Sequence, residues 1–110
     1  MEVFFKNKKL QKCAENTKFS IIKLGPQRSE LYMRRIGDLI AAESLEDLRH
    51  APGHYHELVG DRKGQWACDL DHPYRLIFVP HEEPIPTDEG GKYIWIEIKS
   101  VIVINIEDYH

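Results

Sequence analysis

The sequence predicts an α+β domain in which a helical hairpin packs on a small, mainly antiparallel sheet. Apolar residues in the first half recur at helical spacing, whereas those in the second half alternate with polar residues as in strands. The period changes next to Pro52-Gly53, where a turn is expected. The length of 110 residues suits one domain with a buried core, so residues 1–110 are expected to form a single domain.

The first half is expected to contain one strand followed by two helices. Residues 2–5 are short and aromatic, which indicates a strand. Residues 8–42 are expected to form a helical hairpin with one apolar side, because Gly25 suits a helix end and Pro26 a first helical turn. The expected apolar face comprises Leu10, Cys13, Ala14, Thr17, Ile21, Leu24, Tyr32, Ile36, Leu39 and Ile40, and the opposite face of the second helix carries Arg28, Arg34, Arg35 and Asp38.

The second half is expected to be mainly strands. Ser44 to Asp47 resembles a capping box, which predicts a short third helix that ends before Pro52. Turn residues and an acidic, proline- and glycine-rich loop then divide the remaining chain into alternating segments. The expected strands cover residues 65–70, 74–79 and 95–106. The first two strands are expected to form a hairpin around residues 71–73, and the loop covers residues 80–92. The third strand is apolar on both faces, as is typical of a central strand.

Composition indicates a cytoplasmic globular protein. The net charge of −3 does not suggest a general nucleic-acid binder, although small cationic clusters such as Arg62/Lys63 are compatible with local phosphate contact. No apolar run is long enough to cross a bilayer, and residues 1–6 do not resemble a signal peptide. Cys13 and Cys68 lack a metal-site spacing and are expected to be buried thiols.

One stretch, residues 56–66, combines features of an anion site. Gly60 and Gly64 can bend the backbone, so that Arg62 and Lys63 project from the bend near the imidazole of His56. The same residues also suit a tight turn with solvated charges, and taken alone they favour that interpretation.

Three segments together resemble a known family. The segments 55–66 (YHELVGDRKGQW), 74–78 (YRLIF) and 107–110 (EDYH) are similar to HigB toxins of the RelE/ParE superfamily of type II toxin–antitoxin systems. The resemblance covers essentially the whole chain and implies a RelE-like β-α-α-β-β-β fold. It implies ribosome-dependent cleavage of mRNA in the decoding site and inhibition of translation. The implied partner, besides the ribosome and mRNA, is a helix-turn-helix, HigA-like antitoxin, with which the toxin forms a hetero-oligomer.

Such cleavage needs no metal or cofactor, because the 2′-hydroxyl of the RNA is the nucleophile. Histidine suits the proton transfers, since its pKa lies near working pH. His56 and His110 are the candidates, and which is base and which is acid stays open. Asp108 can orient an imidazole, and Tyr109 can stack on a base or donate its hydroxyl. The residues expected to bind phosphate are Arg62, Lys63 and Arg75.

Structural roles are the alternatives for the same residues. His56 can end a strand, Tyr109 can anchor the last strand, and Arg75 can pair with Asp69 across the hairpin. A zinc site of His54, His56 and His110 lacks a standard ligand spacing and is disfavoured. The alternative function is a non-catalytic binding module of the same fold, either an antitoxin-binding regulator or a gyrase inhibitor.

Overall fold

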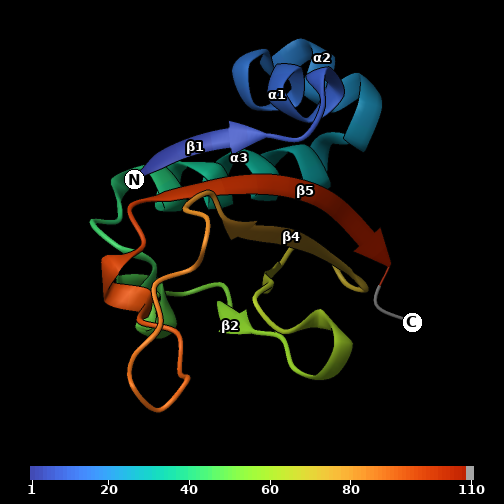
Figure 1. Ribbon diagram of the computed structural model, residues 1–110. Coiled ribbons are helices and arrows are strands. Elements are labelled where there is room, and N and C mark those ends of the chain that lie inside the picture. Colours follow the sequence, from blue (N-terminus) through green and yellow to red (C-terminus); the bar gives the residue numbers. More distant parts are fainter. Residues whose placement is uncertain (109–110) are drawn as a thin grey trace.

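The computed structural model, which describes residues 1–108, contains three α-helices and a five-stranded mixed sheet (Figure 1). The sheet order is β1-β5-β4-β3-β2; β1 runs parallel to β5, and the other neighbours are antiparallel. This confirms the predicted α+β class with a mainly antiparallel sheet. The elements are β1 (Glu2–Phe5), α1 (Lys8–Glu15), α2 (Thr17–Leu24), α3 (Pro26–Ala41), β2 (His56–Glu57), β3 (Trp66–Asp69), β4 (Tyr74–Pro80) and β5 (Ser100–Asp108).

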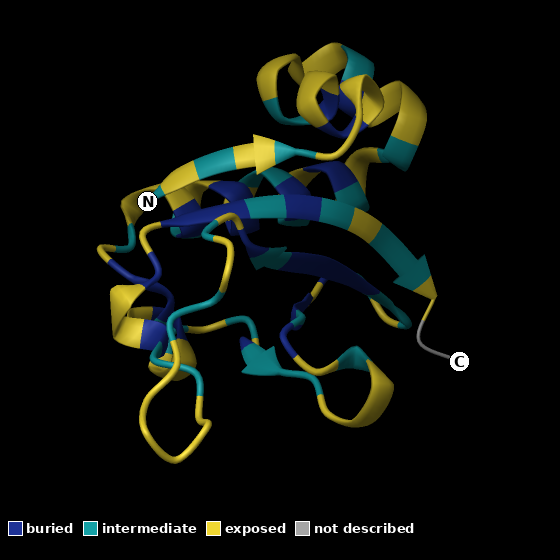
Figure 2. Cartoon of the chain, in the orientation of Figure 1, coloured by how far each residue is buried: buried dark blue, intermediate teal, exposed yellow. Residues whose placement is uncertain are grey.

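The core lies between α3 and one face of the sheet. Tyr32 and Leu39 of α3 are fully buried there, against Trp66, Leu76 and Phe78 of the central strands. Figure 2 shows the buried residues along β4 and the first half of β5. Cys13 and Cys68 are both buried free thiols, as the sequence predicts.

The predicted first helix is two helices. Asn16 ends α1, with its backbone N–H bonded to the Lys12 carbonyl, and begins α2, where its side chain accepts from the Phe19 N–H (2.9 Å). Its extended backbone breaks the helix, so the expected hairpin over residues 8–42 contains a third helix. Gly25 then ends α2 with φ of 84°, and Pro26 begins α3, as expected.

Two side chains of α3 differ from the prediction. Ile40, expected on the apolar face, is 58% exposed. Arg35, expected on the solvent face, is buried because its Nε–H donates to the Asp69 carbonyl at 2.8 Å. This bond and the bidentate pair of Arg28 with Asp71 fasten α3 to β3 and the turn after it.

The second half follows the predicted pattern, except that a short strand, β2, is added before the hairpin and the last strand starts later. The capping box at Ser44 begins a 3₁₀ helix (Leu45–His50), and the β3–β4 hairpin pairs Trp66 with Phe78. Residues Trp95–Glu97, expected to begin the last strand, instead form a 3₁₀ turn, and β5 starts at Ser100. Within residues 1–108, no helix has the length and apolar character needed to span a membrane.

Candidate functional site

The strand register sorts the candidate residues onto the two faces of the sheet. Leu76 and Phe78 of β4 point into the helical core, so Arg75 and Ile77 point to the opposite face. Directly paired residues share a face, which places Glu107 of β5 beside Arg75. By the same rule His56 of β2, paired with Ala67, lies on the face that carries Arg75. The candidate site is therefore the sheet face opposite the helices.

Two arginines converge on one carboxylate at this face. Arg62, in the 3₁₀ turn Gly60–Arg62, makes a bidentate pair with Glu107, one arm of which measures 3.0 Å from Nη2 to Oε2. The Arg75 Nη2 lies 3.0 Å from the Glu107 Oε1, and its Nε also donates to that oxygen (3.3 Å). Arg62 is held further by a bond from Nε to the Gln65 side chain (3.0 Å). The cluster of two guanidiniums and one carboxylate keeps one net positive charge.

Burial makes this cluster energetically important. Arg75 is only 8% exposed, and a buried guanidinium is costly unless a partner compensates its lost hydration. Hydrogen bonds from Arg62, followed by those from Arg75, hold the pKa of Glu107 below its usual range, against the opposing effect of burial. Arg75 therefore pairs with Glu107, although Asp69 is its register partner on the other side.

The surroundings of His56 determine which of its ring nitrogens carries the proton in the neutral ring. Its Nδ1 lies 2.8 Å from the His54 carbonyl oxygen, which can only accept. The proton therefore sits on Nδ1 in the neutral ring, and Nε2 carries the lone pair that can accept a proton. The ring also stacks on His54, with centroids 4.2 Å apart, and the His54 Nδ1 lies 3.5 Å from Asp69. Positioned in this way, His56 has the form of a general base.

His56 and Arg75 share a face without touching. One strand, β3, lies between their strands, and Arg75 is two residues along β4 from the position that is in register with His56. This puts their Cα atoms ~12 Å apart. A gap of this size can hold part of a substrate between the two side chains. It suits two side chains that contact different groups of one substrate.

The remaining candidates lie elsewhere or outside the described part of the chain. Lys63 turns away from the arginine cluster and holds its Nζ over the Tyr93 ring, 5.1 Å from the centroid. Asp108 is paired with Tyr74, which puts it on the helical face of the sheet, opposite to Glu107. Tyr109 and His110 lie outside the described residues. Among residues 1–108, no group of three or more His, Cys, Asp or Glu could hold a metal ion.

Glu107 is the residue that sequence reasoning missed. It belongs to the terminal segment EDYH, in which the resemblance implies roles only for the three residues that follow it. The sequence does contain an indication of its role. An arginine in the middle of a strand requires a partner, and Glu107 directly follows the last predicted strand. The register that joins the two strands cannot be read from the sequence alone, because a one-residue slip would move Glu107 to the other face.

A solved structure shares this architecture. A YoeB/ParE toxin from Agrobacterium tumefaciens matches with a TM-score of 0.50 and 15% sequence identity, over 100% of both chains. The chain has the fold of a YoeB/ParE toxin. Because the identity is low, this likeness describes the fold and not the residues of the site. No protein-family model matches the sequence, and no curated protein matches it.

Proposed function

We propose that the chain is the toxin of a type II toxin–antitoxin system, a HigB-like member of the RelE/ParE superfamily, and that it cleaves mRNA on the ribosome in the cytoplasm. The observation that carries the proposal is the sheet face on which His56 accompanies the Arg62–Glu107–Arg75 cluster. The shared fold with a YoeB/ParE toxin supports it. A helix-turn-helix, HigA-like antitoxin is the proposed partner, bound in a hetero-oligomer.

The proposed reaction is an in-line transfer within the RNA. The 2′-oxygen attacks the adjacent phosphorus as its proton passes to a base, the bond from phosphorus to the 5′ oxygen breaks, and that oxygen receives a proton. The products are a 2′,3′-cyclic phosphate and a 5′-hydroxyl. Each proton transfer by a positioned histidine contributes roughly 10²–10⁴-fold to the rate.

The described residues suit parts of this reaction. The Nε2 of His56 can take the 2′-hydroxyl proton, and the guanidiniums of Arg62 and Arg75 can stabilise the charge on the phosphorane. Proton donation by His110, stacking by Tyr109 and orientation of an imidazole by Asp108 belong to the proposal through the terminal motif. Lys63 is proposed to bind RNA next to the cleaved phosphate, since its side chain contacts Tyr93 and not the arginine cluster.

The proposal is tested by translating a defined mRNA with purified ribosomes and mapping the new 5′ ends. Wild-type protein should cut in the decoding site, and His56→Gln should cut about 10²–10⁴-fold more slowly. His50→Gln is the matched control, because His50 is exposed in the 3₁₀ helix Leu45–His50. Removal of His110 tests the terminal motif in the same assay. Decoding-site cuts that persist unchanged in both site variants would move catalysis to other residues.

One observation favours the alternative of a non-catalytic binding module. Glu107 already engages both guanidiniums, as an acidic segment of a partner protein would. In that case, the arginines would exchange Glu107 for a carboxylate of the partner, such as an acidic segment of the antitoxin. Growth arrest with intact mRNA in the arrested cells would favour this function over cleavage.

A further inference from the structure

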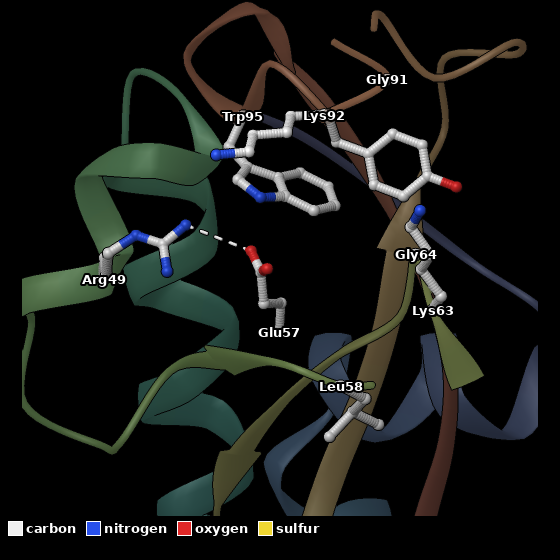
Figure 3. Close-up of a pocket in the computed structure, with 9 residues that line it drawn as sticks. Arg49, Glu57, Leu58, Lys63, Gly64, Gly91, Lys92 and Trp95 are labelled. Atoms are coloured by element: carbon white, nitrogen blue, oxygen red, sulfur yellow. Dashed lines mark hydrogen bonds and ion pairs between the residues drawn. The ribbon is translucent and has the colours of Figure 1, made fainter. Parts of the chain in front are cut away.

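An open pocket lies next to the turn that carries Arg62, and its lining residues other than Lys63 have no role in the proposed chemistry. It has a volume of about 430 Å³, within the range of small-molecule sites. Figure 3 shows Trp95 and Lys92 on one side of it, and Glu57 and Lys63 on the other. Tyr93 also lines the pocket. Arg49 completes the lining and pairs with the Glu57 carboxylate at 3.2 Å.

The lining has the two components of a nucleotide site. Arg49 is shared between the carboxylates of Glu46 and Glu57, and Lys63 and Lys92 leave a net positive charge, so the pocket favours an anion. Tyr93 and Trp95 meet edge to face with centroids 5.2 Å apart, and Lys63 already lies over the Tyr93 ring. Aromatic rings next to cations bind nucleotides through base stacking and phosphate contact.

One turn of the chain links the pocket to the candidate site, although Glu57 alternates with His56 and so points to the other face of the sheet. Arg62 contacts Glu107 on the sheet, and the next residue, Lys63, contacts Tyr93 in the pocket. Gly64 follows with φ of 96°, and a Cβ atom there would lie 3.4 Å from the Ile85 side chain. Glycine at this position lets the turn approach Ile85 and Tyr93, so that Lys63 reaches the pocket while Arg62 stays on the sheet.

Glu57 adds a means of choosing the base. Its Oε2 accepts from Arg49, and the carboxylate points toward the indole of Trp95 inside the pocket (Figure 3). An ionised carboxylate only accepts hydrogen bonds. It therefore favours a base with an exocyclic amino group, such as cytosine, over uracil, whose equivalent group is a carbonyl oxygen.

We propose that this pocket binds one nucleotide, with its base against Tyr93, its phosphate near Lys63 and Lys92, and its amino group donating to Glu57. The further statement that this nucleotide belongs to the mRNA and flanks the cleaved phosphate rests on the proposed function. An acidic peptide is the competing ligand, because the same cations would attract it.

The test uses the full chain and mononucleotides, and no ribosome. The protein has two tryptophans, so its indole N–H groups give two NMR signals, assigned with Trp95→Phe. We expect CMP to shift the Trp95 signal and to bind at least about fivefold more tightly than both ribose 5-phosphate and UMP. Equal affinity for CMP and ribose 5-phosphate would overturn base recognition. A glutamate-rich peptide that shifts the signal when CMP does not would overturn the nucleotide assignment.

Variants separate the contributions of individual side chains to CMP binding. Lys92→Gln and Tyr93→Leu should each weaken CMP binding about fivefold or more, and Tyr93→Leu keeps an apolar side chain for folding. Lys18→Gln, at an exposed position of α2, is the matched control and should bind CMP as the wild type does. Glu57→Gln should bring CMP and UMP to similar affinity, because an amide both donates and accepts.

The ribosome assay distinguishes the two proposals. If mononucleotides bind as expected and wild-type protein cuts no mRNA, the proposed function fails and the pocket remains a nucleotide site. If mRNA is cut and no mononucleotide binds, the pocket proposal alone fails. If both hold, Glu57→Gln should relax the preference for one base beside the cut.

Discussion

At the scale of single residues, Glu107 decides whether the candidate site is stable. It makes ion pairs with the nearly buried Arg75 and with Arg62. Removing one member of a buried ion pair costs more than the pair itself contributes, because the remaining charge stays away from water. Glu107 pairs with two arginines, one of them nearly buried, so the effect of losing this carboxylate should exceed that of an ordinary surface pair.

We expect Glu107→Gln to lower the free energy of unfolding by about 2–3 kcal/mol at pH 7, somewhat less than for a fully buried pair because Arg62 is partly exposed. Glu89→Gln, in the exposed loop, is the control and should change stability by less than about 0.5 kcal/mol. Urea unfolding followed by tryptophan fluorescence measures both. Equal stability of the wild type and Glu107→Gln would show that the arginines do not depend on this carboxylate.

The contribution of Glu107 should also depend on pH. Its pKa is lowered in the folded protein, mainly by hydrogen bonds from Arg62 and then Arg75. A lowered carboxyl pKa stabilises the fold fully above the unfolded value of about 4.3 and loses this effect as pH falls through the folded value. The stability difference between wild type and Glu107→Gln should therefore be constant from about pH 6 to 8 and shrink below about pH 4. A difference that persists undiminished at lower pH would contradict this origin.

At the scale of elements, Asn16 defines two helices at once. Its side chain caps the N-terminus of α2, and its backbone ends α1. We expect Asn16→Ala to destabilise the protein by about 1 kcal/mol, because the Phe19 N–H loses its acceptor, whereas Asn16→Ser should be nearly neutral. Thermal unfolding measures this as a fall of about 4–8 °C for the alanine variant alone. Similar losses in both variants would mean that the cap is unimportant.

The elements also show what a sequence can predict. Apolar period and turn residues located β1, the Gly25-Pro26 junction, the capping box at Ser44 and the β3–β4 hairpin, because each depends on local chemistry. The break at Asn16 was missed because the apolar spacing continues through it, although asparagine is a common cap. The pairing of Arg75 with Glu107 was missed because strand register depends on distant residues.

At the scale of the molecule, acidic charge is distributed unevenly. The chain carries a net charge of −3, and Glu83 and Glu89 are exposed in the loop that supplies Tyr93 to the pocket. Asp88 in the same loop is engaged by the backbone of Gly90 and Lys92. Exposed carboxylates near a cationic site lower its potential over about one Debye length, which is ~10 Å at 0.1 M salt. The loop should therefore weaken binding to a polyanion such as the ribosome.

The position of the acidic residues should affect ribosome binding more than the total charge does. Glu83→Gln/Glu89→Gln and Glu15→Gln/Glu30→Gln each remove two negative charges, but the second pair lies on α1 and α3. We expect the loop pair to bind ribosomes roughly threefold to tenfold more tightly at low salt and the helix pair to bind nearly as the wild type does. Co-sedimentation at increasing salt measures this, and the difference should vanish near 1 M, where the Debye length is about 3 Å. Equal gains in ribosome affinity for both double variants would show that net charge, and not the position of the loop charges, governs binding.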